Sequence, residues 1–503
     1  MPVILRDYQE HGVTRIRASL QTHQAPLFVA PTGAGKTVLF SYIAAAASAK
    51  GNRVTIVAHR FELLAQISLA LGRFGIHHGI IAPGITPDPR ALVQVASVQA
   101  LASRLKRSSF TIPTDLLIVD EAHHVQQSNS WGRIYAALGA PPTLGVTASP
   151  IRSDGKGLGV ECGGIFDDII EVISTGELID QGYLAKPIVY APAERLDLTG
   201  IRSRGGDYEK SELADRVDKP RITGHAVDHY QEICRGLTSV AFGVSIEHCQ
   251  HISEEFRSAG HRFEVIDGDM DKDRRKDLIA GLGKGIDGLV SCDLIGEGVD
   301  IPAIGCAIML RPTHSTGLHV QQMGRPLRPI YADGFDVETM EGRFGALAAA
   351  GKTNAFILDH VGNSLVHGLP ETPREWSLAG ITRKQRKAEE SALPIKQCEK
   401  CYAVYPAGPI CSICGHEQSV ASRKVEQVEG KLRKITPEEA AAIALQKKKE
   451  RRQVNAARTL TELQNYAENK GYSPTWAEHV FNARERAAQK RIDNQAQSFL
   501  RLP

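Results

Sequence analysis

The stretch APTGAGKT, residues 30–37, decides how the rest of the chain is interpreted. It lies between the apolar run PLFVA (26–30) and the Ala-rich run VLFSYIAAAA (38–47), an order that predicts a strand, a tight loop and a helix. Glycines in such a loop let successive N–H groups point at phosphate oxygens, and the start of the helix adds its positive dipole end. The general phosphate-loop pattern asks for glycine where this chain has Ala30, so a structural turn is the alternative.

Ala30 fits the phosphate-loop interpretation because it ends the predicted strand, where a negative φ is allowed and glycine is not required. Lys36 is placed to reach the terminal phosphates of a nucleotide, and the Thr37 hydroxyl is placed to hold Mg²⁺. The predicted nucleotide-binding residues of the loop are Gly33, Ala34, Gly35, Lys36 and Thr37.

A carboxylate pair, Asp120 and Glu121, stands at the end of the apolar run LLIVD (116–120). An aspartate at the carboxyl end of a buried strand faces the crevice where open α/β sheets bind ligands. We therefore predict that Asp120 holds Mg²⁺ through water and that Glu121 orients and deprotonates a water that attacks the phosphate. Two adjacent acidic residues usually only lie on the protein surface, so this prediction depends on the phosphate loop at 30–37.

The segment QQMGRPLR, residues 321–328, supplies positive charge from a later part of the chain. Arg325 and Arg328 are three residues apart and share one face if the segment is helical. Arginines that reach the γ-phosphate from a second domain stabilise the charge that develops in the transition state. Taken alone, the run would more often be a solvated helix face.

Size and composition place these motifs in an ordinary globular protein of several domains. The chain has 503 residues, with 42% hydrophobic and 23% charged residues. It has no run of about 18 apolar residues, and its first residues do not resemble an export signal, so we expect no membrane span and a location in the cytoplasm of a bacterium, or of a phage's host. Nine cysteines without an export signal indicate a reducing compartment.

Two blocks of short apolar runs alternate with helical stretches, which predicts two parallel sheets covered on both faces. The runs of the first block are 26–30, 54–58, 92–97, 116–120 and 143–148, and those of the second are 239–245, 262–268, 287–293, 306–311 and 354–360. Residues 195–220 are polar and turn-rich and are expected to be an insert or linker. After residue 373 the strand pattern stops.

The C-terminal part holds a cysteine cluster and a basic tail. Cys398, Cys401, Cys411 and Cys414 follow C-x₂-C-x₉-C-x₂-C, which predicts a closed structural zinc site, with disulfides as the alternative. Residues 374–503 hold 24 Lys and Arg against 15 Asp and Glu, an excess of nine positive charges, while the preceding residues have an excess of six negative charges. This asymmetry indicates either an anionic partner or a solvated, largely helical surface.

Together the motifs resemble those of the superfamily-2 helicases of the DEAD/DEAH-box kind, from about residue 5 to residue 360. The stretches that carry the resemblance are LRDYQ (5–9), APTGAGKT (30–37), AHRFELLAQ (58–66), ASVQAL (96–101), DEAH (120–123), TASP (147–150), VAFGVSIEHC (240–249), DLIGEGVDIP (293–302) and QQMGRPLR (321–328). The phosphate loop of this superfamily commonly begins with alanine. The cysteine cluster and GYSPTWAEHVF (471–481) narrow the resemblance to RadD-like bacterial and phage-encoded members.

The resemblance implies an α/β fold of two tandem RecA-like domains with ATP between them, plus a small zinc knuckle and a helical C-terminal tail. The expected ranges are 1–190 for the ATP-binding domain, 191–222 for a linker or insert, 223–373 for the helicase C-terminal domain, 390–420 for the knuckle and 421–503 for the basic tail. Further residues take roles by motif position: Gln9 as the base contact, Gly298, Asp300 and Gln321 in the ATP cleft, Arg60, Ser97 and Gln99 at nucleic-acid phosphates, and His123, Thr147 and Ser149 in coupling the two.

The sequence thus predicts an ATP-dependent helicase that uses Mg²⁺, carries structural Zn²⁺ and acts on nucleic acid, with DNA favoured over RNA, alongside unidentified replication or repair proteins. One alternative is a translocase or remodeller that does not separate strands. Another is a zinc-bearing clamp that nucleotide only switches, although Glu121 and the two arginines argue against it. A third, the motor subunit of a restriction or transport complex, has no nuclease signature or membrane segment in the sequence.

Overall fold

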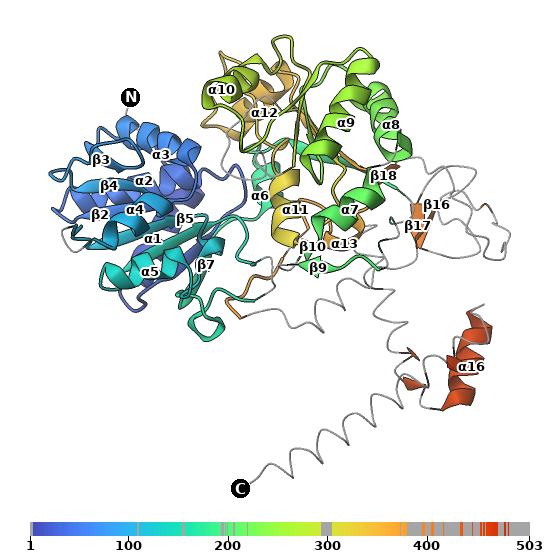
Figure 1. Ribbon diagram of the computed structural model, residues 1–503, viewed down its shortest axis with the longest axis horizontal. Coiled ribbons are helices and arrows are strands. Elements are labelled where there is room, and N and C mark those ends of the chain that lie inside the picture. Colours follow the sequence, from blue (N-terminus) through green and yellow to red (C-terminus); the bar gives the residue numbers. More distant parts are fainter. Residues whose placement is uncertain are drawn as a thin grey trace, which may run out of the picture. The chain divides into compact units, whose positions relative to one another are not determined.

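The computed structural model describes residues 4–379 with short gaps, and separate segments after that. The gaps are 108–109, 153–155, 193–195, 197, 199, 205–206, 219, 293–303 and 373, and the later segments are 395–397, 404–406, 416, 433–435, 445, 453–454, 456–457, 459–470, 477–478 and 481. Two compact units divide the chain, Met1–Pro437 and Glu438–Pro503. The first unit contains two seven-stranded sheets and two two-stranded ones, and we call each seven-stranded sheet with its helices a lobe (Figure 1).

The first lobe is built on a seven-stranded parallel sheet. Its strand order is β3 (His78–Ile81), β4 (Val93–Ser97), β2 (Val54–Ala58), β5 (Leu116–Asp120), β6 (Thr143–Thr147), β1 (Pro26–Val29) and β7 (Asp168–Glu171). Its helices are α1 (Asp7–Ser19), α2 (Lys36–Ser48), α3 (Phe61–Arg73), α4 (Val98–Leu105), α5 (Ser130–Ala137) and α6 (Thr175–Asp180).

The strands of this lobe are apolar at successive residues because each face of the sheet borders its own hydrophobic core. In β5, Ile118 belongs to one core, while Leu117 and Val119 belong to the other. Helices α1, α2 and α3 contribute to the first core, and α4 and α5 contribute to the second. All five residues of β5 are therefore buried, and its carboxyl end delivers Asp120 to the edge of the sheet.

The second lobe is also a seven-stranded sheet, and six of its strands are parallel. Its order is β12 (Phe263–Val265), β13 (Gly288–Ser291), β11 (Ser239–Phe242), β14 (Cys306–Met309), β15 (Asn354–Asp359), β8 (Lys186–Ala191) and β18 (Arg433–Ile435). Its helices are α7 (Lys210–Val217), α8 (Pro220–His229) continuing into a π-helical turn (Tyr230–Cys234), α9 (Ile246–Ser258), α10 (Lys272–Gly281), α11 (Thr316–Met323), α12 (Met340–Ala349) and α13 (Ser364–His367). The prediction of two α/β domains with parallel sheets is confirmed.

Two strands of the second sheet come from unexpected parts of the chain. Strand β8 lies in the range expected for the first domain, 1–190, except for its last residue, yet it pairs with β15 of the second sheet. Strand β18 lies in the tail that was expected to be helical, and it pairs antiparallel with β8. A short hairpin, β9 (Ser203–Arg204) and β10 (Asp207–Tyr208), occupies the predicted insert.

The expectation that strands end after residue 373 is wrong, since β16 (Ile395–Gln397) and β17 (Val404–Pro406) also form an antiparallel pair. Strands of three residues are too short to show an alternating pattern in the sequence. In the second unit the structure describes helix α16 (Leu460–Asn469), which is capped by Thr459 and Glu462. No described helix is long and apolar enough to cross a bilayer.

Candidate active site

The phosphate loop joins β1 to α2 and bends at two glycines. Gly33 has φ 88° and Gly35 has φ 73°, a left-handed conformation that residues with a Cβ rarely adopt. A Cβ atom on Gly35 would also lie 2.6 Å from Gln9 Nε2, and one on Gly33 would lie 2.7 Å from Leu184 Cδ2. Both positions therefore require glycine, and the loop ends at the first turn of α2, where free N–H groups favour an anion.

Ala30 is accommodated as the sequence suggested. Its N–H donates to the Thr147 carbonyl (3.1 Å), so the residue prolongs the pairing of β1 with β6. It is not among the described residues with positive φ, and it is buried. Glycine is unnecessary at this position because the sharp bend begins only at Gly33.

The N-terminal helix braces the phosphate loop. The Tyr8 hydroxyl donates to the Ala34 carbonyl (2.9 Å), and Gln9 Nε2 donates to the carbonyls of Ala34 (3.2 Å) and Gly35 (3.3 Å). Gln9 Oε1 accepts from the Arg6 N–H (3.0 Å), so both ends of this buried amide have partners within the protein. Bracing of the loop is thus a role of Gln9 that the structure records, whereas its contact with a base stays a prediction. No sequence pattern indicates the role of Tyr8, whose acceptor lies 26 positions later in the chain.

Lys36 is the first residue of α2, and the charges of the carboxylate pair act on its amine. Nζ donates to the carbonyls of Ala30 (3.1 Å) and Pro31 (3.2 Å). Burial lowers the pKa of Lys36, and the nearby charges of Glu121 and Asp120 partly oppose this shift. Thr37 follows as the second residue of α2 and is partly exposed.

The carboxylate pair stands at the end of β5, and the backbone of Glu121 is strained. Asp120 is buried, and burial together with the charge of Glu121 raises the pKa of Asp120 to about 7, while Lys36 acts in the opposite direction. Asp120 Oδ1 accepts from the Glu121 N–H (3.0 Å). Glu121 has φ 51°, a conformation that costs a non-glycine residue roughly 1–3 kcal/mol and persists only where its surroundings enforce it.

A chain of polar contacts leads from Glu121 toward the second lobe. His123 Nδ1 lies 3.4 Å from Glu121 Oε2 and 3.1 Å from Thr147 Oγ1. Thr147 Oγ1 in turn donates to the Ser149 carbonyl (3.1 Å) and accepts from the Ser149 N–H (3.2 Å). A Cβ atom on Gly317 of α11 would lie 2.9 Å from Ser149 Oγ, so the chain ends against a helix of the second lobe.

Helix α11 and the turn after it bring the second-lobe residues to the phosphate loop. Gln321 and Arg325 are buried, and burial lowers the pKa of Arg328 to about 10. Both arginine charges act on Lys36 and lower its pKa. A Cβ atom on Gly33 would lie 4.0 Å from Arg328 Cγ. Lys36 and the two arginines therefore belong to one neighbourhood.

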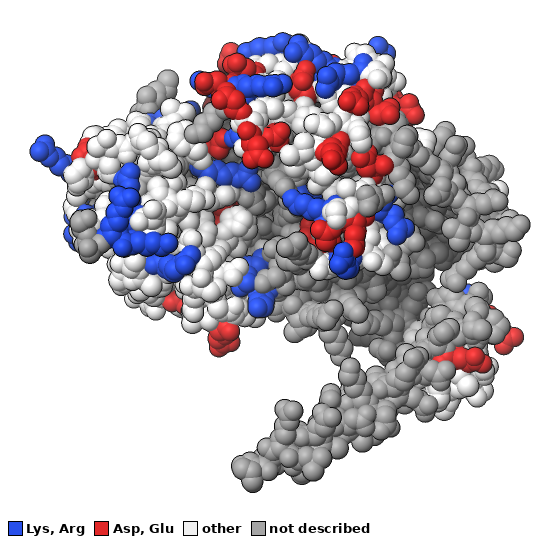
Figure 2. Space-filling model, in the orientation of Figure 1, with Lys and Arg blue, Asp and Glu red and all other residues white. Residues whose placement is uncertain are grey.

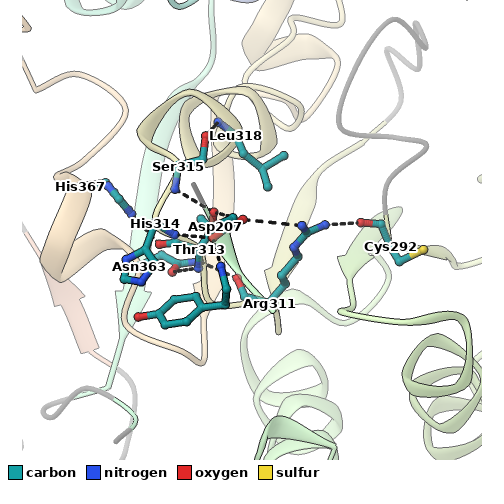
Figure 3. A network of polar contacts seen from close by, with 10 residues as sticks. Asp207, Cys292, Arg311, Thr313, His314, Ser315, Leu318, Asn363 and His367 are labelled. Atoms are coloured by element: carbon teal, nitrogen blue, oxygen red, sulfur yellow. Dashed lines mark hydrogen bonds and ion pairs between the residues drawn. The ribbon is translucent and has the colours of Figure 1, made fainter. Parts of the chain in front are cut away.

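A polar network fixes the connection between β14 and α11 (Figure 3). The Asp207 carboxylate, from the insert hairpin, accepts from Thr313 Oγ1 (2.8 Å) and the His314 N–H (2.7 Å). Arg311 Nη2 lies 3.7 Å from the same carboxylate, and Arg311 Nη1 donates to the Cys292 carbonyl (2.8 Å). No sequence pattern indicates this network, because Asp207 meets Thr313 and His314 from more than a hundred positions earlier in the chain.

An ion pair links the lobes away from the phosphate loop. Arg275 Nη1 of α10 donates to Glu62 Oε1 of α3 (2.6 Å), and Arg275 Nη2 donates to the carbonyls of Gly268 (2.9 Å) and Met270 (3.2 Å). The Arg275 side chain is 11% exposed and that of Glu62 is 29% exposed. Solvent therefore screens the pair less than an ordinary surface pair.

The three residues predicted at nucleic-acid phosphates differ in their surroundings. Ala58 of β2 pairs with Ser97 of β4, so Arg60 and Gln99 each follow this pair by two residues at the same sheet edge. Gln99 is exposed, and Arg60 Nε donates to His59 Nε2 (3.0 Å). The Ser97 hydroxyl is buried and accepts from the Ala100 N–H (3.2 Å), which makes it the cap of α4.

Six predicted residues lie outside the described part of the chain, namely Gly298, Asp300, Cys398, Cys401, Cys411 and Cys414. Among the residues that the structure does describe, no group of three or more His, Cys, Asp or Glu is arranged to hold a metal ion.

Comparisons with known proteins agree with this layout. Residues 2–152 match the family model of the res subunit of type III restriction enzymes, and residues 227–329 match that of the helicase conserved C-terminal domain. A 51.5 kDa protein of a Lactococcus phage is 30% identical over 422 residues, which cover 83% of this chain and 84% of that protein. This chain belongs to the superfamily-2 helicases. The prediction of this superfamily is thereby confirmed, and the helicase is an ATP-dependent enzyme of nucleic acid.

More distant relatives of this helicase include the DNA 3'-5' translocase XPB2 of Sulfurisphaera tokodaii, 26% identical over 362 residues, with 64% of this chain and 78% of that protein covered. The IRC3 proteins of Saccharomyces cerevisiae and Schizosaccharomyces pombe are 28% and 31% identical, and the helicase spans only 49% and 55% of their lengths. The DNA-bound restriction-modification enzyme LlaBIII resembles the helicase in fold, with a TM-score of 0.50 at 16% identity, over 71% of this chain and 28% of that one.

Proposed function

We propose that this helicase is a motor on DNA whose ATP site lies between the two lobes. The observation that carries the proposal is the shared neighbourhood of Lys36, the Asp120–Glu121 pair and the second-lobe arginines around one glycine-bent loop. A buried lysine between carboxylates and guanidinium groups is poised for a polyanion, because a triphosphate would balance the excess positive charge.

In this proposal the chain's own residues divide the work of hydrolysis. Loop N–H groups and Lys36 bind the phosphates, Gln9 contacts the base, and Glu121 accepts a proton from the attacking water. Arg325 and Arg328 stabilise the charge that develops on the γ-phosphate, and Gln321, Gly298 and Asp300 complete the cleft.

Mg²⁺ suits this site, since Asp120 is a buried carboxylate at the strand end and Thr37 is a partly exposed hydroxyl at the helix start. Bound there by Thr37 and, through water, by Asp120, it would neutralise charge on the phosphate oxygens.

Coupling to movement would pass along the polar chain from Glu121 to Ser149. Loss of the γ-phosphate changes the charge that faces Glu121, and His123 and Thr147 connect that carboxylate to the residue that contacts α11. Loss of the phosphate would in this way shift the residues that contact α11, and the second lobe would move with them.

DNA is the proposed track, with Arg60 and Gln99 as phosphate contacts at one sheet edge. Figure 2 shows a face of the first lobe on which the charged side chains are predominantly Lys and Arg, which supports an anionic partner. The relative XPB2 is a DNA translocase, and LlaBIII was solved on DNA. XPB2 also supports a second candidate, translocation without strand separation.

The narrower predictions belong to the same proposal. They are kinship with RadD-like and phage-encoded helicases, domain limits at 222 and 373, a zinc knuckle at 390–420, a basic and mainly helical tail, a cytoplasmic location, and replication or repair partners. Strands β16 and β17 support the knuckle, because Cys398 and Cys401 fall between them in the sequence.

The test is the rate of ATP hydrolysis with single-stranded, duplex and forked DNA and RNA, run beside an unwinding assay. We expect DNA to stimulate hydrolysis and Lys36→Ala to abolish it. Normal hydrolysis by Lys36→Ala would rule out this loop as the ATP site, and stimulation by RNA alone would rule out DNA as the track. Stimulation without unwinding would favour the translocase.

A further inference from the structure

Lys352 is a buried cation to which the function above gives no role. It stands between α12 and β15 and is 4% exposed. Its Nζ donates to the carbonyl of Pro326 (2.8 Å) and to that of Ile304. Burial lowers the pKa of Lys352 to about 8, and the neighbouring Cys306 acts in the opposite direction. Burying an amine is unfavourable unless the amine is hydrogen-bonded, so the two carbonyls offset part of the cost of placing Lys352 here.

The two acceptors of Lys352 lie close in sequence to residues that the proposed function assigns to the ATP cleft. Pro326 stands directly after Arg325 and two residues before Arg328. Ile304 is the first described residue after 293–303, the segment that contains Gly298 and Asp300. One amine therefore connects the turn between the two arginines with Ile304, the residue that follows this segment.

The backbone beside Pro326 is held from its other side as well. The Leu327 carbonyl accepts from the Ala185 N–H (2.8 Å), and the Leu327 side chain is buried in the core of the first lobe. Leu184, the residue before Ala185, packs where a Cβ on Gly33 would lie. Lys352 supplies a second anchor, at the peptide that separates the two arginines.

We propose that Lys352 is a positioning residue that aims Arg325 and Arg328 at the γ-phosphate. This inference rests on the proposed roles of the two arginines. Without the amine, the Pro326 carbonyl loses its donor and the turn that carries both guanidinium groups can shift. A misplacement of about 1 Å can lower a catalytic rate on the order of 100-fold, while nucleotide binding through the first-lobe loop is retained.

The experiment compares Lys352→Met with an exposed matched control, Lys284→Met, in the full chain. Each is made in the wild-type background and in an Arg325→Ala/Arg328→Ala background. The readouts are kcat and KM for ATP, the binding of a fluorescent non-hydrolysable ATP analogue, and the temperature of thermal unfolding. Since methionine fills a similar volume, the fold should persist.

We expect Lys352→Met to lower kcat by a factor on the order of 10 to 100 with KM and analogue binding within about twofold. In the arginine-deficient background the same change should alter the residual rate less than about twofold, because the groups it positions are gone. Lys284→Met should match its parent throughout.

Equal losses in both backgrounds would overturn the proposal, since Lys352 would then act on something other than the arginines. A large fall in unfolding temperature together with lost analogue binding would also overturn it and make the lysine a residue of the core. If instead the proposed function is wrong, wild type and Lys284→Met would themselves show no hydrolysis stimulated by nucleic acid, a result that differs from both outcomes above.

Discussion

Replacing Asp207 with asparagine should loosen the entry to α11 by a measurable free energy. The carboxylate accepts hydrogen bonds from Thr313 and His314 and faces Arg311 at 3.7 Å. Asparagine offers one acceptor oxygen and turns an NH₂ group toward one of these donors. A hydrogen bond to a charged group contributes about 1.5–3 kcal/mol, so we expect a loss of about 2 kcal/mol.

Hydrogen exchange at the backbone amides of residues 313–318 reports this loss directly. The His314 amide donates to Asp207, and local opening exposes it to solvent. Since 1.4 kcal/mol is a factor of ten, about 2 kcal/mol predicts roughly 30-fold faster exchange there. Glu212→Gln, in the same insert, is the control, because its partner Arg202 is 77% exposed and such pairs contribute at most about 1 kcal/mol. Unchanged exchange in Asp207→Asn, or equal acceleration in both variants, would refute the reasoning.

Three further predictions follow from the site. Glu121→Gln should bind ATP and stall, because the amide cannot accept the proton of the attacking water; loss of ATP binding in an equilibrium titration would contradict the assigned role. Glu62→Ala should raise the KM for ATP about tenfold if the Glu62–Arg275 pair contributes about 1.4 kcal/mol to the arrangement of the lobes that binds nucleotide, and an unchanged KM would show that the pair does not matter to it. Metal analysis should find one zinc per chain, and its chelation should weaken nucleic-acid binding more than basal hydrolysis; equal losses would mean that the zinc only holds the fold.

The strands at the centre of each sheet were predictable from the sequence, and several of those at the margins were not. Strands β2 and β5 are buried on both faces, so they read as unbroken apolar runs. Strand β3 buries only alternate residues, and β8 begins with the exposed Lys186, so neither stood out from its surroundings. Strand β18 pairs with a partner more than two hundred residues earlier, and such a distance leaves no local signal.

Some residues of the candidate site were likewise predictable from the sequence, and others were not. Gly33, Gly35 and Asp120 follow from local rules, since left-handed backbone and strand ends constrain the residue types that can stand there. The bracing by Tyr8 and the anchoring by Lys352 do not follow from such rules. Each depends on a side chain that meets a backbone carbonyl more than twenty positions away, and any donor of suitable length can make that contact.

The antiparallel pairing of β18 with β8 has a consequence for how this protein can be shortened. A chain cut before Arg433 would leave β8 with a bare row of N–H and C=O groups along one side. A strand of a second molecule can pair with that free edge. The shorter chain should therefore aggregate, as measured by light scattering, even though every helicase motif remains. By covering the edge of β8, the tail would prevent self-association of the helicase, a role separate from ATP hydrolysis.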